Sequence, residues 1–515
     1  MPQSLVIQVG QCGNQIGRRF WERALLEHSA HNPHGLYNDP LATFFRNVKS
    51  SGRKRSTIGV GDGTGEIHGL EARGIMVDME EGVLGAFLRD TSSPMAELFV
   101  SPHQTITSSS GSGNNWAVGH HHYGPQYRDV IADAVRKEAE QCDALQSVFL
   151  LHSLGGGTGS GLGTYISSLL ADELPDAYQF ATVVAPAPNA DDVVTSPYNT
   201  VLALAQLTEH ADAVLPIDNQ ALLDVCARAG RSRSRPAATD GASTAVADPA
   251  AAEQRPFDAM NDVVAQLMLH LTSSMRFEGS LNVDINEITM NLVPFPKLKY
   301  LLSSLVPTGP SNSSRGLGSL PPAAHHSAGR TTATPPPSLH RANTTSAHHI
   351  DAMFTEAFTK DAHLVKCDPR QSTYLACAVM VRGSGVQVTD IRRNIDRIQS
   401  GLKFAWWNTE GWKTGLCSVP PQGGAPHALL ALSNNCSIGE SFAGVKTRFM
   451  KLYSRKANVH HYLEHMDRSE FSTALASITD LIGEYRRIDS DPGPAVDDWE
   501  QWAHEQAARF VGANG

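Results

Sequence analysis

The chain has 515 residues, of which 41% are hydrophobic and 18% are charged, and its formal net charge is −10. This length and apolar content predict a globular protein of roughly two to four domains. The negative charge argues against a nucleic-acid-binding surface, and no apolar run approaches the roughly 18 residues of a membrane-spanning helix. Met1–Ser4 leads straight into a strand-like run, without the pattern of a signal peptide. The 7 cysteines are scattered and form no CxxC pair, which indicates reduced thiols and argues against a zinc site.

Two loops rich in small residues are expected early in the chain. A strand over Leu5–Val9 is followed by GQCGNQIG at Gly10–Gly17, which turns into a helix. Further along, GSGNNW at Gly111–Trp116 offers small residues and backbone amides where the main chain could approach a ligand closely. Loops at strand and helix boundaries are the ligand-binding elements of an open α/β sheet.

The most informative segment is SVFLLHSLGGGTGSGLGTYISSLL, at Ser147–Leu170. A strand-like run leads into Gly155–Gly163, where 6 of 9 residues are glycine, and a helical apolar pattern then resumes. Without Cβ atoms, successive backbone N–H groups can surround an anion, and the start of a helix favours negative charge. No lysine follows, so this is neither GxxxxGK[ST] nor GxGxxG. The pattern predicts a phosphate-binding loop of backbone amides, assisted by the hydroxyls of Thr158 and Ser160.

The rest of the chain alternates predicted core elements with two segments that lack apolar periodicity. Gly230–Arg255 and Thr308–His349 are predicted to be disordered surface insertions. Between them, apolar residues recur every three or four positions over Phe257–Leu271, which predicts a buried core helix. The later expected strands are Leu375–Val381, Leu402–Trp406 and Ala428–Leu432, and the expected helices are Thr389–Gln399, Glu440–Tyr453 and Glu470–Arg487, the last with Ser469 as N-cap.

Taken together, these motifs resemble those of the tubulin family. Their order matches the family along about the whole chain apart from the two insertions and the tail, so the chain is identified as a member. DMEEG, LPIDNQ and WNTEGWKT are most similar to the epsilon type, which is associated with centrioles and basal bodies. The motifs are GQCGNQIG at Gly10–Gly17, VDMEEG at Val77–Gly82, GSGNNWAVGH at Gly111–His120, GGGTGSG at Gly155–Gly161, SPYN at Ser196–Asn199, IDNQAL at Ile217–Leu222, MNLVPFP at Met290–Pro296 and CDPR at Cys367–Arg370.

The resemblance implies a tubulin-like α/β fold with a Rossmann-like GTP-binding domain on a parallel sheet. A core helix, a second α/β domain with a mixed sheet, and C-terminal helices should follow. The expected boundaries are 1–229 for the GTP-binding domain, 230–255 for the first insertion, 256–275 for the core helix, 276–438 for the second domain with its insertion at 308–349, 439–488 for the C-terminal helices and 489–515 for the tail. The tail differs from the glutamate-rich terminus of ordinary microtubule subunits.

The resemblance also implies a set of nucleotide contacts. Phe257 would stack on the guanine base and Asn261 would hydrogen-bond to it, while Cys12 would sit beside the nucleotide. The other expected contacts are Gly10, Gln11, Gln15, Ser112, Gly113, Asn114, Ser153, Gly155, Gly156, Gly157, Thr158, Gly159, Ser160, Ser196 and His210.

Two of the family's nucleotide contacts are replaced in this chain, and a third is matched with a two-residue difference in loop length. The carboxylate that helps to hold Mg²⁺ is best matched by Asp62 in GDGTG, although a loop aspartate is also an ordinary turn former. The acidic ribose contact falls at Ser196, which offers a hydroxyl instead. A base-reading asparagine falls at His210, with Asn219 assigned to the separate IDN motif. GTP or GDP binding is still expected because the phosphate loops are intact.

The acidic segment LNVDINE places Asp284 and Glu287 three residues apart, so that on a helix both carboxylates share one face. From the residues alone, such acids are most simply solvated side chains. In alpha-type tubulins, the corresponding segment docks onto the next subunit's nucleotide and its acids orient the attacking water. The resemblance therefore implies catalysis in trans, because phosphoryl transfer depends on positioning the nucleophile.

Two hypotheses follow. In the first, the chain is a GTP-binding tubulin of the centriole or basal body that assembles longitudinally with other tubulins, and it hydrolyses GTP only on assembly. In the second, it is a non-polymerising adaptor that binds nucleotide statically and pairs with a dedicated partner such as delta-tubulin. Alpha/beta-tubulin and centriolar proteins are further expected partners. The chain is expected in the cytoplasm, in the cytoskeleton of the centriole or basal body, and neither membrane nor nucleic-acid binding is expected. A bacterial-type cell-division GTPase shares GGGTGSG but is disfavoured by the long C-terminal helical region.

Overall fold

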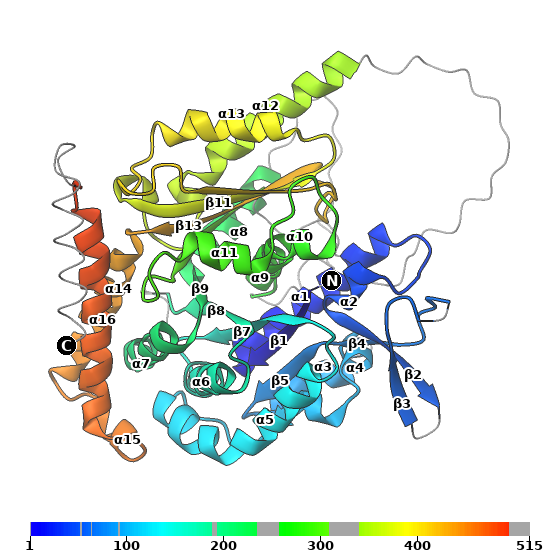
Figure 1. The fold of residues 1–515 in the computed structure, drawn as a ribbon. Coiled ribbons are helices and arrows are strands. Elements are labelled where there is room, and N and C mark those ends of the chain that lie inside the picture. The colour runs from blue at the N-terminus through cyan, green and yellow to red at the C-terminus, as the bar shows by residue number, and fades with distance from the viewer. Residues whose placement is uncertain are drawn as a thin grey trace, which may run out of the picture.

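The computed structural model describes residues 2–51, 54–62, 64–90, 93–187, 193–233, 257–307 and 339–493. Two sheets with helices packed on them are joined by a central helix, and a pair of long helices runs along one side of the molecule (Figure 1). Within these ranges, the helices are too short or too polar to cross a lipid bilayer.

The first domain is built on a six-stranded, fully parallel sheet with the order β6, β5, β1, β7, β8, β9. The chain starts in the middle, builds to one edge and then to the other, which is the expected doubly wound arrangement. Its topological switch point lies between β1 and β7, and ligands of such sheets bind beyond the carboxyl ends of the strands at that point. The strands are β1 (Gln3–Val9), β5 (Gly74–Asp78), β6 (Thr105–Thr107), β7 (Leu145–Ser153), β8 (Tyr178–Ala185) and β9 (Ala213–Asp218).

Helices cover both faces of this sheet, and a small antiparallel sheet of β2, β3 and β4 flanks it. The helices are α1 (Gly10–His31), α2 (Asp39–Ala42), α3 (Glu81–Arg89), α4 (Met95–Leu98), α5 (Gly124–Ala139), α6 (Gly163–Glu173), α7 (Ser196–His210) and α8 (Asn219–Arg233). The flanking strands are β2 (Phe45–Ser51), β3 (Lys54–Ile58) and β4 (Leu70–Ala72).

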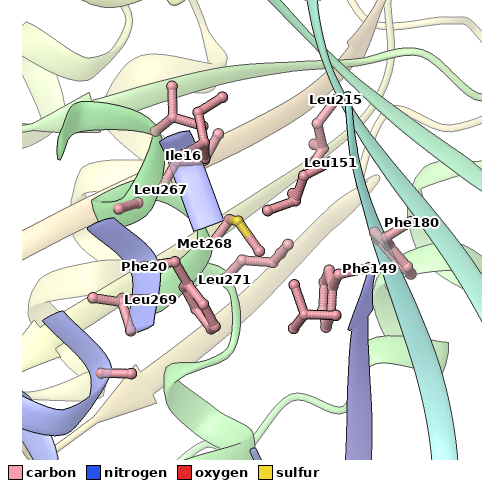
Figure 2. Packing of buried hydrophobic residues seen from close by; sticks show 14 of the residues in the cluster. Ile16, Phe20, Phe149, Leu151, Phe180, Leu215, Leu267, Met268, Leu269 and Leu271 are labelled. Atoms are coloured by element: carbon pink, nitrogen blue, oxygen red, sulfur yellow. The ribbon is translucent and has the colours of Figure 1, made fainter. Parts of the chain in front are cut away.

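Alternate residues of β1 enter different cores, as the period of a strand requires. Val6 joins the core shared with α1 and the central helix α9 (Asp258–Leu271), whereas Leu5 and Ile7 pack with α5 and α6. Figure 2 shows the first of these cores, where buried side chains of α1, α9 and strands β7 to β9 meet.

The central helix α9 is buried along most of its length, which confirms the predicted core helix. An ion pair of 2.6 Å between Arg23 and Asp262 joins it to α1. Arg276 follows the end of α9 and pairs with the buried Glu27 of α1 at 2.5 Å. Glu27 also pairs with Arg382 at 2.6 Å, so α1 is tied to both α10 (Ser273–Arg276) and β11 (Tyr374–Gly383). Burial alone would raise the pKa of Glu27, but the two guanidinium charges lower it to about 2.

The second domain has the expected mixed sheet, with the order β10, β13, β11, β12. Only β11 and β12 are parallel. The predicted strand Leu402–Trp406 is wrong, because Phe404 makes a single bridge to Tyr374, and β12 is an additional strand. The other elements are α11 (Ile285–Leu292), β10 (Leu301–Val306), α12 (Leu339–Ala357), α13 (Val388–Gln399), β12 (Trp412–Cys417) and β13 (His427–Asn435).

The C-terminal helices α14 (Ile438–Tyr453), α15 (Val459–Leu463) and α16 (Arg468–Asp489) pack on α7 and on each other. The predicted N-cap of α16 is wrong by two residues, because the cap position is Asp467 and Ser469 already lies inside the helix.

Both predicted insertions are shorter than expected. Helix α8 continues to Arg233, inside the first insertion, and α12 begins at Leu339, inside the second. The remaining residues, 234–256 and 308–338, lie outside the described residues, as does the tail from residue 494.

Candidate nucleotide site

A cavity of about 450 Å³ lies at the switch point of the parallel sheet. The three loops singled out in the sequence converge on it after β1, after β6 and after β7, and the start of α9 closes it. The predicted contacts that line it are Gly10, Gln11, Cys12, Gln15, Ser112, Gly113, Asn114, Ser153, Gly155, Gly156, Gly157, Thr158, Gly159, Phe257 and Asn261.

Glycine is required where these loops touch one another. Gly10 has a φ of +72°, and a Cβ there would lie 3.0 Å from the backbone nitrogen of Gly159. A Cβ on Gly157 would lie 2.5 Å from the backbone nitrogen of Asn115. By contrast, a Cβ on Gly156 would meet only ordinary contacts, at 3.5 and 3.8 Å, although Gly156 lines the cavity. Gly10 and Gly157 thus allow the loops to pack together, whereas Gly156 leaves space for what fills the cavity.

The loop after β7 enters a π-helical turn at Thr158–Leu162, which continues directly into α6. Free backbone N–H groups at such a helix start form an anion site. The hydroxyls of Thr158 and Ser112 lie 2.8 Å apart, and both residues line the cavity. Ser160 does not line the cavity: it is fully buried, and its hydroxyl donates to the carbonyl of Gly156. Its predicted role at the phosphate is therefore wrong.

Asn199 of α7 holds the loops in register, and the sequence reasoning missed this role. Its side-chain amide donates to the carbonyls of Asn114 at 2.8 Å and Gly155 at 2.7 Å. Its side-chain oxygen accepts from the backbone N–H of Trp116 at 3.0 Å and from the hydroxyl of Tyr462 at 2.6 Å. One buried amide therefore joins two loops of the site to α15. The only feature of the sequence that pointed to a role for Asn199 was its place in the family motif SPYN.

Phe257 also lines the cavity and is 54% exposed, so its ring is accessible for stacking on a ligand. Asn219, which was not expected at the nucleotide, also lines the cavity, whereas His210 does not. The assignment to His210 is wrong for a topological reason. Helices that connect parallel strands run back along them, so the last residue of α7 lies far from the carboxyl ends. Asn219 instead follows β9 directly.

Ser196 is also absent from the lining. It is 1% exposed at the start of α7, and a Cβ on Gly155 would lie 3.6 Å from the Cβ of Ser196. Ser196 is thus packed behind the glycine loop, and the predicted ribose contact is wrong.

Among the described residues, the acids at the cavity are Asp78, which ends β5, and Glu80. Oδ2 of Asp78 is buried and has no hydrogen-bond partner in the described part of the chain, and burial together with the charge of Glu80 raises the pKa of Asp78 to about 7. Asp62, the predicted Mg²⁺ ligand, does not line the cavity. Its carboxylate accepts the N–H of Gly59 at 3.0 Å and closes a turn, so that assignment is wrong.

The pair Asp78 and Glu80 fits a magnesium ion, which commonly takes one or two carboxylates together with nucleotide phosphates and water. In the described part of the chain, no three His, Cys, Asp or Glu side chains form a metal cluster. Such a site would therefore depend on the nucleotide for its other ligands. The neighbouring Cys12 is chemically quiet, because burial raises the pKa of its thiol to about 12.

The second predicted group of residues lies outside this cavity. Asp284 is the exposed N-cap residue of α11, and Glu287 lies in the first turn of the same helix. The start of α9 lines the cavity, and the acidic segment follows beyond its other end. A 14-residue helix is about 21 Å long. Neither Asp284 nor Glu287 lines the cavity.

Comparison with known proteins agrees with this geometry. Residues 3–227 match the family model described as "Tubulin/FtsZ family, GTPase domain", and residues 322–447 match the "Tubulin C-terminal domain". The chain is 48% identical over 510 residues to the tubulin epsilon chain of Mus musculus, covering 97% of this chain and 98% of that one. Identity and coverage are the same for the tubulin epsilon chain of Homo sapiens. The chain belongs to the tubulin family.

Family membership confirms the predicted recognition and the fold class. It makes the chain a tubulin-type cytoskeletal subunit, and its GTPase domain implies that the cavity binds GTP or GDP. The contacts that the lining residues make to the nucleotide remain predictions.

Proposed function

We propose that this chain is a GTP-binding tubulin subunit that assembles longitudinally in a centriolar or basal-body array. In such an assembly, the segment with Asp284 and Glu287 docks onto the nucleotide of the adjacent tubulin and activates its hydrolysis. The observation that carries the proposal is that these acids do not line the nucleotide cavity and follow in the chain after the end of α9 opposite to it. In such a subunit, the nucleotide cavity lacks the catalytic acids, and the acidic segment lacks a nucleotide. Each of these two sites would be completed by a neighbouring subunit.

The residues of the cavity would divide the work of binding. Backbone amides at Gly155–Gly159 would surround the phosphates, while Phe257, Asn261 and Asn219 would hold the base. Asp78 and Glu80 would hold Mg²⁺, which neutralises phosphate charge when it is bound.

In the neighbour's site, Glu287 would orient the attacking water and accept its proton as the water attacks the γ-phosphate, the bond from the γ-phosphorus to the β–γ bridging oxygen breaks and GDP leaves. Asp284, being exposed at the helix start, would assist the same water. Positioning of this kind is the chief contribution that a protein makes to phosphoryl transfer.

GTP turnover and bound-nucleotide content of the purified chain over a series of concentrations would test the proposal. Turnover per subunit should rise with concentration, alone or with added alpha/beta-tubulin, because hydrolysis needs a docked neighbour. Glu287→Ala should leave nucleotide content unchanged and lower the assembly-dependent rate by about 10²-fold or more. Bound GTP that remains intact at every concentration would instead favour a static adaptor, for example one paired with delta-tubulin.

A further inference from the structure

The acidic segment is not a free loop, because the edge strand β12 holds it in place. The backbone of Leu281 pairs with Leu416 through two hydrogen bonds, of 2.8 and 3.4 Å. A Cβ on Gly279 would lie 1.9 Å from the carbonyl oxygen of Leu416, and a Cβ on Gly415 would lie 3.0 Å from Val283. This fit fixes the chain just before Asp284 against β12.

The same strand also reaches Glu287 through a side chain. Side chains alternate along a strand, so Lys413 and Gly415 share the face of β12 that lies against the acidic segment. The ring of Trp412, on the opposite face, packs on those of Phe358 and Phe404, with centroids 5.8 and 5.4 Å apart. Nζ of Lys413 lies 2.9 Å from Oε2 of Glu287.

This ion pair orients the carboxylate. Oε2 of Glu287 is buried against Lys413, yet 44% of the Glu287 side chain is exposed. Lys413 is more enclosed, at 26% exposure, so it is the less mobile partner. One oxygen is thereby held by the lysine, and the rest of the carboxylate faces outward, where a docked neighbour would lie.

We infer that Lys413 is a positioning residue for catalysis in trans. It holds Glu287 in the one orientation in which its outward oxygen can bind the attacking water of the neighbouring subunit. The inference rests on the proposed function, and it assigns to β12 the role of supporting both parts of the acidic segment. Lys413 touches neither nucleotide and acts only through Glu287.

A two-population experiment tests this role. Acceptor subunits carry GTP labelled on the γ-phosphate at low concentration, and donor subunits loaded with unlabelled GDP are added in increasing amounts. Release of labelled phosphate in a single turnover gives a maximal rate and a donor concentration at half-maximum. Alpha/beta-tubulin serves as a second acceptor in parallel.

Donor Lys413→Gln should lower the maximal rate about tenfold, because a misplaced catalytic group loses much of its effect. The half-maximal donor concentration should stay the same, and Lys413→Arg should restore most of the rate because it keeps the charge. Lys446→Gln, which changes a lysine of α14 that is half-buried like Lys413, is the matched control and should behave as wild type. In a Glu287→Ala donor, adding Lys413→Gln should cause no further loss, since the lysine acts through the missing carboxylate.

The outcomes separate this inference from the proposed function. A Lys413→Gln donor with an unchanged maximal rate, or one that slows the Glu287→Ala donor further, overturns the positioning role alone. A Glu287→Ala donor as active as wild type overturns the proposed function, and the role of Lys413 with it.

Discussion

The two glycines Gly156 and Gly157 offer a test that distinguishes a ligand-contacting position from a structural one. Alanine at Gly157 would place its Cβ 2.5 Å from the nitrogen of Asn115 and 2.6 Å from Oγ of Ser112. Relieving these contacts requires a shift of nearly 1 Å in the neighbouring loop, and overpacking of this kind costs about 1–3 kcal/mol. For a domain of this size, the midpoint of thermal unfolding should fall by about 2–12 °C.

Alanine at Gly156 should behave differently. Its Cβ would meet Oγ of Ser153 at 3.5 Å and Oδ1 of Asn114 at 3.8 Å, which are ordinary contacts, so the stability of the nucleotide-free protein should change by less than about 1 kcal/mol. The methyl group would nevertheless enter the cavity and displace the phosphates. Loss of one charge-assisted hydrogen bond, worth about 1.5–3 kcal/mol, should weaken GDP binding about 10- to 100-fold.

Both variants can be compared by thermal unfolding, by chromatographic analysis of bound nucleotide and by equilibrium dialysis with labelled GDP. Gly483→Ala is the control, because Gly483 is exposed on α16 and a Cβ there would have no neighbour within 4 Å among the residues that the structure describes. Wild-type affinity for GDP in Gly156→Ala would refute the placement of phosphates at this loop. A large loss of stability in the same variant would show that the loop packing has been misunderstood.

Three further predictions concern buried polar groups. The first concerns Asp78→Asn, measured with GDP and EDTA present. As the pH rises from about 5.5 to 7, the free energy of unfolding of this variant should increase by about 2 kcal/mol relative to that of the wild type, because the Asp78 carboxyl, with a pKa of about 7, keeps its proton to higher pH in the folded chain than in the unfolded one. Added Mg²⁺ should then raise the thermal unfolding midpoint of the wild type only. Glu27→Gln should lose about 3–5 kcal/mol in urea unfolding, because it leaves Arg276 and Arg382 buried without their carboxylate. Since the pKa of Glu27 is lowered to about 2, its stabilising effect in the wild type should be complete above its ordinary pKa of 4.5 and should disappear as the pH falls toward 2. Tyr462→Phe removes a hydrogen bond to Asn199 worth about 0.5–1.5 kcal/mol, and should speed release of a fluorescent GDP analogue about two- to tenfold; an unchanged release rate would show that α15 does not restrain the site.

The sequence was sufficient for the loops of the site because local patterns determine them. A strand, a glycine loop and a helix start can each be recognised from adjacent residues, and the parallel sheet then brings their ends together. The same logic could have found Asp78, since it ends a strand of that sheet. It was overlooked because GDGTG at Asp62 offered a more conspicuous loop aspartate, which instead closes a turn with Gly59.

Other features depend on contacts between distant parts of the chain. Lys413 meets Glu287 across more than a hundred residues, through an edge strand that has too few apolar residues to be recognised by its periodicity. Asn199 looks like an ordinary polar residue of a helix until its four partners from other elements are known. The insertion boundaries were misplaced because composition changes gradually, whereas helix α12 already begins among polar residues at Leu339.

The side-chain amide of Asn199 connects the outer helices to the nucleotide site, so binding at one should affect the binding affinity at the other. If a protein bound to α15 shifts Tyr462 and thereby changes the dissociation constant of GDP by some factor, the nucleotide must change the affinity of that protein by the same factor. A coupling of about 1.4 kcal/mol, close to one hydrogen bond, already corresponds to a factor of ten. Proteins that attach to the outside of such a subunit could therefore sense which nucleotide it holds without ever touching the cavity.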